Sequence, residues 1–493
     1  MVQRVSTVAL EGIEARAVDV QVQVAPGLPA FNVVGLPDKA VSEARERVRS
    51  AMIAAGLALP ARRITVNLAP ADLPKEGSHY DLPIALGLMA AIGAIPPAAL
   101  DGSLRAVRGT LSLAESLWRA GATTLLCAAD AAPEAALVEG LAVLPVRALG
   151  AVADWLRGGE IEAQAPAMPD PEPVAASDLS EVRGQRMAKR ALEIAAAGGH
   201  HLLLVGPPGA GKSMLAGRLP GILPPLLPEE ALTVTRLHSA SGARAPGRGL
   251  VRRRPFRAPH HSLSRAALIG GGAPPRPGEL SLAHHGVLFL DELSEYPRGL
   301  LDALREPLEE GAISIARASG HARFPARALL VAAMNPCKCG WLGHPKRGCR
   351  CTPTELAQHH AKVSGPVLDR LDLQVEVPAL TSHELLRAPP GEPSAAVRER
   401  VIAARARQRA RGFLNAALPN DALRRCCALE PEARHLIADA VDRGGMSARG
   451  VHRALRVART IADLAGEEPV GALRLAEALH YRAYEARRFA TSR

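Results

Sequence analysis

A glycine-rich segment near the middle of the sequence has the residue types and spacing of a phosphate-binding turn. It fits the pattern G-x-x-x-x-G-K-[ST], follows an apolar run and opens a helix-forming stretch. Lys212 can reach the β- and γ-phosphates of a nucleotide, and Ser213 can ligate Mg²⁺. The turn itself and the start of the helix supply backbone N–H groups to the phosphates. We therefore predict an ATP and Mg²⁺ site made by Gly206, Pro207, Pro208, Gly209, Ala210, Gly211, Lys212 and Ser213.

Two adjacent carboxylates follow a second apolar run, Val287–Leu290. A buried strand that ends in paired acids would place Asp291 beside the Mg²⁺ ion and Glu292 beside an attacking water molecule. Alone, this pattern is ordinary surface, but the upstream glycine-rich turn favours the catalytic interpretation. We predict Asp291 as a Mg²⁺ ligand and Glu292 as the general base of ATP hydrolysis.

A third apolar run, residues 328–334, ends at Asn335. In a parallel sheet, a polar side chain at such a strand tip lies near the ligand, so Asn335 can orient the attacking water. The alternative is a turn-forming asparagine before Pro336.

Four cysteines stand together just after this asparagine, and four thiolates so close in sequence can surround Zn²⁺ tetrahedrally. The spacing is C-x-C rather than the more usual C-x-x-C, and His344 could replace one sulfur atom. Reduced thiols that bind no metal are the other interpretation. The candidate zinc ligands are Cys337, Cys339, Cys349 and Cys351.

The net charge of +11 is concentrated in one part of the chain. No aspartate or glutamate occurs between Ala231 and Gly278, so the arginines there form a basic segment that favours a polyanionic partner. A genome rich in GC would explain the choice of Arg over Lys, but it would not explain the missing acids. The arginines of this segment are Arg236, Arg244, Arg248, Arg252, Arg253, Arg254, Arg257, Arg265 and Arg276.

The elements that must position these residues divide the chain into an α/β part and a helical part. β-like runs and helices alternate up to residue 157, and residues 158–177 are rich in Pro, Ala and acids, which is typical of a linker. Residues 178–378 alternate strands and helices as a parallel sheet requires, and residues 379–493 contain helical patterns only. No apolar run is long enough to span a membrane and no secretory signal is present, so we expect a cytoplasmic protein.

The residues above belong to longer segments that resemble the ComM/YifB family, AAA+ ATPases related to the ATPase subunit of magnesium chelatase. The matching segments cover nearly the whole chain and include GLPDKAVSEARERVRSA, NLAPADLPKEGSHYDLPIALG, GHHLLLVGPPGAGKSMLA, FRAPHHSLSRAALIGGG, RPGELSLAHHGVLFLDELSEY, AAMNPCKCG, SGPVLDRLDL and SARGVHRALRVARTIADL. The resemblance implies an AAA+ αβα P-loop domain over residues 178–378, with the Cys-rich loop 337–351 inside it. It also implies a helical lid over residues 379–493.

The same resemblance implies roles for two arginines and a ring of subunits. Arg370 would be an arginine finger that reaches the nucleotide of the neighbouring subunit in a homo-hexameric ring. Arg449 would touch the γ-phosphate within its own subunit, with Arg453 one turn later as the alternative. Without the resemblance, a salt bridge between helices would be the first interpretation of both roles.

A helix-2 insertion between Arg257 and Leu282 is also implied, and in relatives it projects into the ring pore. Its basic flank would bind DNA phosphates with steep salt dependence, and the alternative is a solvated loop. The arginine-rich helix Val397–Arg411 is a second candidate surface for DNA.

The first 157 residues resemble the Lon-protease-like domain of the same family. Residues 74–78 match the segment around the protease nucleophile, which would be Ser78, but no lysine occurs between Lys75 and Lys189 to activate it. We expect no proteolysis and a docking or regulatory role, for which the sequence names no partner.

These residues and resemblances are compatible with three functions. The leading hypothesis is a hexameric ATP-driven translocase or helicase, acting on single-stranded or branched DNA, that promotes branch migration in recombination during natural transformation. A magnesium chelatase motor subunit is the second, although the N-terminal domain and the four-cysteine loop argue against it. A regulated AAA+ protease is the third.

Overall fold

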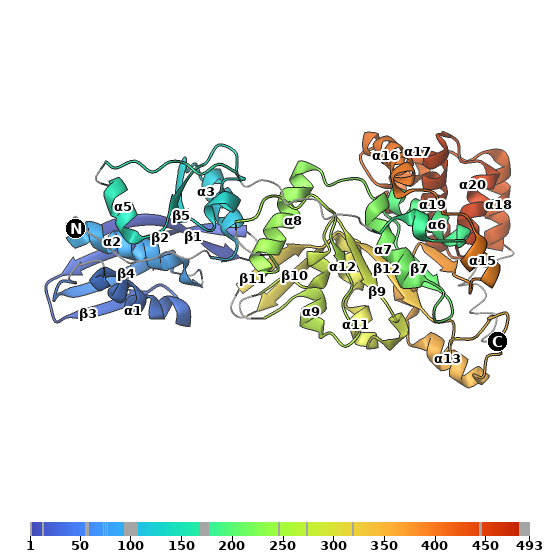
Figure 1. Cartoon of the computed structure of the whole chain (residues 1–493), viewed down its shortest axis with the longest axis horizontal. Helices are drawn as coiled ribbons and strands as arrows, with labels where there is room; N and C mark the ends of the chain where they lie inside the picture. The colour runs from blue at the N-terminus through green and yellow to red at the C-terminus, as the bar shows by residue number, and fades with distance from the viewer. Residues whose placement is uncertain are drawn as a thin grey trace.

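The structure is a computed structural model in which an N-terminal α/β domain, a central α/β domain and a helical domain follow one another along the long axis (Figure 1). The predicted α/β class, with a parallel sheet and C-terminal helices, is confirmed. The Lon-protease-like identity of the first domain and the domain boundaries remain predictions. The structure describes residues 2–11, 14–54, 59–71, 73, 75, 77–92, 107–156, 158–166, 177–244, 247–272, 275–317, 320–442 and 446–482.

The N-terminal domain contains a four-stranded sheet in the order β1-β2-β4-β3, in which only β3 and β4 are parallel. Every second residue of β2 and β4 is buried, because one face of the sheet packs against helices, and Val20, Val22 and Val66 lie in that core. The elements are β1 (Val2–Glu11), β2 (Glu14–Ala25), β3 (Ala30–Val34), β4 (Arg63–Ala69), α1 (Lys39–Ala54), η1 (Ser78–Tyr80) and α2 (Asp81–Ile92).

A smaller lobe completes this domain around a pair of parallel strands, β5 and β6. Leu111, Ala132 and Val143 form the centre of its own apolar cluster. Its elements are α3 (Thr110–Arg119), β5 (Thr124–Ala128), α4 (Ala132–Ala135), β6 (Ala142–Val146) and α5 (Leu149–Leu156).

The central domain is built on a five-stranded parallel sheet in the order β13-β7-β12-β9-β8. Strands β7, β9 and β12 are buried at every residue, as expected where helices cover both faces of a parallel sheet. Alternate residues serve the two faces: Leu202 and Leu204 join one cluster, and Leu203 joins the other. The strands are β7 (Leu202–Val205), β8 (Phe256–Arg257), β9 (Val287–Leu290), β12 (Leu329–Met334) and β13 (Leu373–Glu376).

Helices and one antiparallel hairpin surround this sheet. The hairpin, β10 (Ala312–Arg317) with β11 (Gly320–Pro325), packs through Phe324 against Leu237 of α8 (Pro228–Ser241). The remaining elements of this domain are η2 (Leu179–Glu181), α6 (Arg186–Gly198), α7 (Lys212–Ile222), α9 (Arg265–Ile269), α10 (Glu279–Leu282), η3 (Leu293–Glu295), α11 (Arg298–Asp302), α12 (Arg305–Glu310), α13 (Pro353–Ala361) and α14 (Gly365–Leu368).

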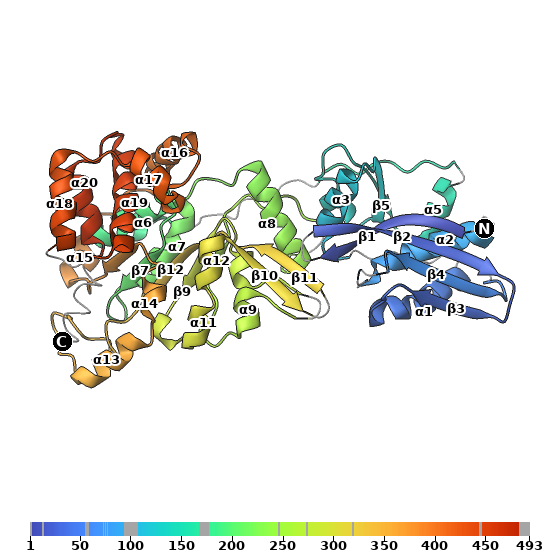
Figure 2. The ribbon, with the colours of Figure 1, turned by 180° about the vertical axis from the view of Figure 1, so that it is seen from behind.

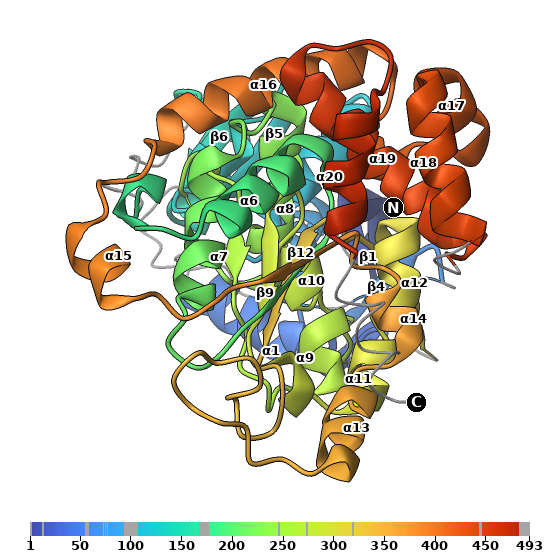
Figure 3. The same ribbon diagram turned by 90° about the vertical axis from the view of Figure 1, so that its right-hand side faces the viewer.

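The C-terminal helices pack over α6 and α7 at the end of the molecule opposite to the N-terminal domain (Figure 2). In the end-on view, α13 and the loop before it lie at the edge away from α16 and α17 (Figure 3). None of the helices in the described part of the chain has the length and apolar character that crossing a membrane requires. The elements are α15 (Ser382–Arg387), α16 (Ser394–Ala410), η4 (Asn415–Ala417), α17 (Asn420–Cys426), α18 (Pro431–Asp442), α19 (Ala448–Ala465) and α20 (Ala472–His480).

Candidate nucleotide-binding site

Three neighbouring strands of the parallel sheet end at the edge where the predicted site residues lie. β7 ends in the glycine-rich turn, β9 ends before Asp291, and β12 ends before Asn335. Gly209 and Gly211 both have positive φ, and this conformation favours glycine. Gly206 is needed for another reason, since a Cβ atom there would lie 2.2 Å from the carbonyl oxygen of Val377. The backbone thus explains the glycines of the turn.

Lys212 is buried under this turn and is held by three acceptors. Its Nζ donates to the carbonyl oxygens of Gly206 at 2.7 Å and Pro207 at 3.0 Å, and to Oδ1 of Asn335 at 3.1 Å. Burial lowers the pKa of Lys212, and the charges of Asp291 and Glu292 oppose that shift. The ammonium group therefore lies where a phosphate can replace the carbonyl oxygens as its partner.

Oxygen atoms suited to Mg²⁺ meet beside the lysine. The Ser213 hydroxyl donates to Oδ2 of Asp291 at 2.5 Å, and both side chains line a pocket of about 360 Å³. Hydroxyl and carboxylate oxygens are the hard donors that Mg²⁺ takes from proteins while keeping substrate phosphate and water as its other ligands. The pair fits the predicted metal. The same pocket is lined by Pro208, Gly209, Ala210, Gly211, Lys212, Met214, Glu292, Met334 and Asn335.

Glu292 has a strained backbone and an unexpected neighbour. Its φ is +51°, in the left-handed region that non-glycine residues seldom occupy, and such strain is concentrated at functional sites. Nδ1 of His261 lies 3.4 Å from Oε2 of Glu292. His261 belongs to the segment that joins β8 to α9, so the sequence distance hid this contact. The adjacent histidines at 260 and 261, after a strand of the same sheet, were the only signal for it.

The arginines predicted to contact nucleotide lie outside the pocket of their own chain. In the described part of the chain, neither Arg370 nor Arg449 nor Arg453 lines the pocket. Arg370 bonds Glu309 and the carbonyl oxygens of Arg305 and Pro366 within its own chain. Burial lowers the pKa of Arg370, and the nearby charges of Arg305, Arg453 and Arg449 add to that effect.

Arg449 and Arg453 therefore lie near Arg370, the predicted finger, and not in the nucleotide pocket of the same chain. Arg453 donates to Oδ1 of Asp372 at 3.0 Å. Burial alone would raise the pKa of Asp372, but the hydrogen bond from His200 and the charge of Arg453 lower it to about 2. In this arrangement Arg449 does not line the pocket of its own subunit, where it would contact a γ-phosphate.

The basic segment, residues 231–278, is partly structural. Arg254 is buried and bonds Glu230 at 2.8 Å and the carbonyl oxygens of Pro224 and His285 at 2.6 Å. Arg257 forms a bidentate pair with Glu279, which ties the two ends of the predicted insertion together. The expectation that Arg254 contributes to a surface is wrong, because its charge is used inside the domain. The exposed arginines of the segment are Arg248, Arg252, Arg253, Arg265 and Arg276.

Helix α16, the second candidate surface, also uses most of its arginines internally. Arg405 is buried against the carbonyl oxygen of Ala196, and Arg400 pairs with Glu193 and Glu392. Arg407 and Arg411 bond Asp463 of the lid. The contacts of Arg400 and Arg405 with α6 hold the lid on the central domain, and those of Arg407 and Arg411 fasten α16 within the lid. This pairing leaves few arginines of the helix for DNA.

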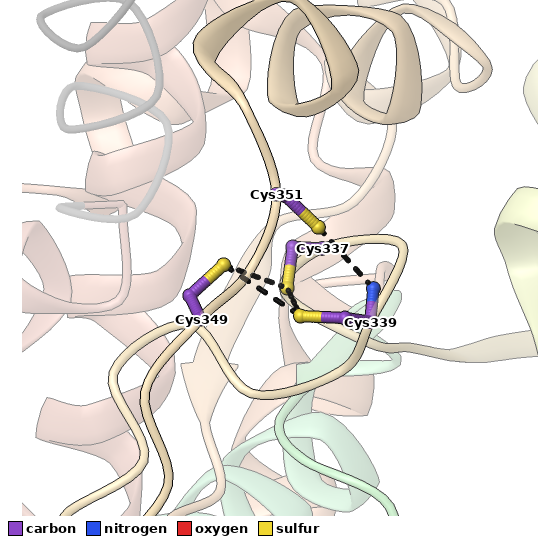
Figure 4. Close-up of side chains that lie close together, drawn as sticks. All are labelled: Cys337, Cys339, Cys349 and Cys351. Atoms are coloured by element: carbon purple, nitrogen blue, oxygen red, sulfur yellow. Dashed lines mark hydrogen bonds between the residues drawn. The ribbon is translucent and has the colours of Figure 1, made fainter.

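The four cysteines converge on one point (Figure 4). Sγ of Cys337 lies 3.4 Å from that of Cys339 and 3.7 Å from that of Cys349, and the Cys339 and Cys349 sulfur atoms are 3.6 Å apart. Nδ1 of His344 instead accepts hydrogen bonds from the backbone N–H groups of residues 346 and 347, at 3.1 and 3.0 Å. The alternative of a histidine ligand is therefore not supported.

The protease-like segment of the N-terminal domain gives less information. Lys75 is fully buried and bonds the carbonyl oxygen of Pro70. Ser78 begins the short helix η1, but its side chain lies outside the part of the structure that is described.

Comparison with known proteins identifies related sequences for all three parts. Family profiles described as "Subunit ChlI of Mg-chelatase", "Magnesium chelatase, subunit ChlI" and "Magnesium chelatase, subunit ChlI C-terminal" match residues 20–131, 178–385 and 391–482.

Relatives that match over nearly their full length come from several bacteria. The chain is 45% identical over 501 residues to "Uncharacterized protein YifB" of Escherichia coli, which covers 98% of this chain and 97% of the relative. It is 44% identical over 490 residues to "Competence protein ComM" of Haemophilus influenzae, with 96% of each chain covered. An uncharacterised protein of Mycobacterium tuberculosis is 43% identical over 502 residues, covering 98% of this chain and 99% of the relative.

Proposed function

Because this chain belongs to the ComM/YifB family of magnesium-chelatase-like AAA+ ATPases, we propose that it is a homo-hexameric, ATP-driven DNA translocase or helicase. We further propose that it promotes branch migration of recombining DNA during natural transformation. The relative from Haemophilus influenzae is named a competence protein, and this name is consistent with the proposed process.

The separation of the arginines from the pocket of their own chain is the observation that best supports the proposal. Lys212, Asp291 and Glu292 line one pocket, while Arg370 and Arg449 lie together elsewhere. A pocket that lacks a guanidinium gains one when the arginine face of a second subunit docks against it. In a closed ring every subunit would give one face and receive the other.

The pocket residues have proposed roles in hydrolysis. Lys212 and the turn amides would bind the phosphates, and Ser213 with Asp291 would hold Mg²⁺, which when bound neutralises phosphate charge. Glu292 would take the proton of the attacking water, and Asn335 would orient that water. The Arg370 guanidinium of the next subunit, with Arg449 beside it, would stabilise the transition state by roughly 4–7 kcal/mol.

DNA is proposed as the partner because exposed arginines flank the insertion. Arg252, Arg253, Arg265 and Arg276 are exposed, and the stretch from 231 to 278 contains no acid. A ring that carries this surface towards its pore would attract phosphates by releasing counterions. The proposed cofactors are ATP, Mg²⁺ and a structural Zn²⁺ on the four thiols.

The direct test is ATP turnover of the purified protein, with and without single-stranded, duplex and forked DNA. We expect turnover to rise with DNA, most of all with the forked substrate, and ATP to produce displaced strands. ATPase activity that none of these DNAs changes, but that the partner subunits of magnesium chelatase stimulate, would support the motor-subunit alternative instead. Casein degradation that is lost in Ser78→Ala would support the protease alternative.

A further inference from the structure

The sulfur geometry of the four-cysteine cluster fits a bound metal ion. The four Sγ atoms all lie within 4.8 Å of one another, and the distances among the Cys337, Cys339 and Cys349 sulfur atoms are 3.4 to 3.7 Å. A zinc ion with Zn–S bonds of about 2.3 Å requires sulfur atoms about 3.8 Å apart at the corners of a tetrahedron. The observed cluster is therefore close to the shape that a ZnS₄ centre needs.

Backbone amides support the sulfur atoms as they do in metal centres. The N–H group of Leu342 donates to Sγ of Cys337, and that of Cys339 donates to Sγ of Cys351, both at 3.4 Å. Such bonds stabilise thiolate charge and orient ligands around a metal. Four sulfur ligands without carboxylate or imidazole suit Zn²⁺, and the same set could take iron.

The loop that carries the cluster is attached to the nucleotide pocket at its first residue. Residues 335–352 join β12 to α13 without helix or strand, and Asn335 at their start bonds Lys212. Nε2 of His359 donates to the Asn335 carbonyl oxygen at 3.0 Å, and that of His360 donates to the Pro336 carbonyl oxygen at 3.1 Å. Helix α13, which follows the loop, thereby holds the first two residues of the loop.

The loop also touches the phosphate-binding turn directly. Gly340 lies between the cysteine pairs and is buried. A Cβ atom there would lie 2.7 Å from Cδ of Pro208, whose neighbours in the turn line the pocket. Any displacement of the cysteine loop therefore displaces or releases Pro208.

We propose that one Zn²⁺ ion, bound by Cys337, Cys339, Cys349 and Cys351, fixes the loop 335–352 as a wall of the nucleotide pocket. Bound zinc holds Asn335 against Lys212 and Gly340 against Pro208. Loss of the metal lets both contacts loosen, so that nucleotide affinity depends on zinc. The proposal rests on the use of ATP at this pocket, and it assigns to the metal a role in binding nucleotide rather than DNA.

Metal analysis of the purified full-length chain is the first measurement. We expect a single zinc ion per chain by elemental analysis, with no visible absorbance. Cys349→Ser and Cys351→Ser should each lose the zinc, whereas Cys426→Ser, a thiol outside the cluster, should keep it. Wild-type protein without zinc overturns the proposal, and a visible charge-transfer spectrum assigns the site to iron and overturns it as well.

The second measurement is the dissociation constant of a fluorescent ATP analogue, measured without DNA. We expect about tenfold to hundredfold weaker binding in Cys349→Ser and Cys351→Ser, because small displacements of positioning groups have effects of this size. Gly340→Ala adds a Cβ atom against Pro208 at a residue whose φ of +82° favours glycine, so it should bind the analogue more weakly. Zinc retained in this folded variant assigns the loss to the loop contact rather than to the metal. Unchanged affinity in zinc-free but folded Cys349→Ser, judged by circular dichroism, would overturn the proposal.

These outcomes are distinguishable from failure of the proposed function. Wild-type protein that does not bind or hydrolyse ATP refutes the proposed function itself. Wild-type protein that hydrolyses ATP, together with zinc-free variants that bind it equally well, refutes only the role of the metal.

Discussion

The backbone and the side chain of Glu292 indicate a catalytic rather than a structural role. Its backbone is strained and its side chain is exposed at the rim of the pocket, so packing does not explain it. Glu292→Gln should bind ATP normally and lose at least about a hundredfold in kcat, because general-base catalysis contributes this much. Single-turnover kinetics and analogue binding measure the two effects. Glu295→Gln, a nearby acid paired with Lys362, serves as the matched control, and equal turnover in Glu292→Gln and wild type would contradict the role.

We expect His261 to restrain that carboxylate in the absence of DNA. Its ring lies 3.4 Å from Glu292, on the segment that leads into the exposed Arg265. His261→Ala should raise DNA-independent turnover by about two- to fivefold, the size of one exposed charged contact. Steady-state ATPase assays without DNA measure it. His260→Ala is the control, since its ring bonds Ser262 rather than the carboxylate, and an equal effect of both substitutions would argue against a specific restraint.

Single residues were predictable where a local pattern encodes them. The glycine-rich turn, the paired acids and Asn335 each follow an apolar strand, and parallel strands bring such tips to one edge. The contact of His261 with Glu292 and the grouping of Arg449 with Arg370 depend on how distant segments pack. No spacing in the sequence encodes those relations.

At the scale of elements, the basic segment before β8 separates into exposed and structural arginines. Arg252 and Arg253 are exposed, so the double substitution to Ala should weaken DNA binding and leave folding intact. Each lost phosphate contact should reduce the slope of log K against log salt by about 0.7–0.9. Binding isotherms at several salt concentrations measure this slope, and an unchanged slope would exclude these two side chains from the interface.

Arg254 provides the contrast within the same run. Its removal leaves Glu230 without its buried guanidinium, which should lower the free energy of unfolding by about 3 kcal/mol. Chemical denaturation of Arg254→Ala measures this loss. Stability equal to that of the Arg252 and Arg253 variant would contradict the internal role.

The elements themselves were predicted to within a few residues wherever apolar periodicity is strong. The strands at 287–290 and 329–334 are examples. The hairpin of β1 and β2 was missed, although Val18, Val20 and Val22 alternate with polar residues in the strand pattern.

At the scale of the whole molecule, α8 connects the N-terminal domain with the ATPase domain. Arg236 of α8 lies 2.7 Å from Glu115 and 3.4 Å from the Ser112 hydroxyl, both on α3, and Leu232 packs into the small apolar cluster there. The opposite side of α8 packs on the β10–β11 hairpin (Figure 1). This helix therefore contacts both the N-terminal domain and the ATPase domain, a connection that the sequence did not indicate.

The central claim is that the active pocket is shared between subunits, because Arg370 lies away from the pocket of its own chain. Arg370→Ala should lose about three orders of magnitude in turnover, and Lys212→Ala should lose turnover as well. Mixing the two variants in equal amounts restores both groups at roughly a quarter of the interfaces of a random ring.

The most direct measurement is therefore ATP turnover of that mixture, with ring formation verified by mass measurement of differently tagged subunits. The account predicts turnover far above that of either variant alone and close to a quarter of the wild-type value. Mixed rings that stay as inactive as the separate variants, or a wild-type monomer that hydrolyses ATP at the full rate, would contradict it.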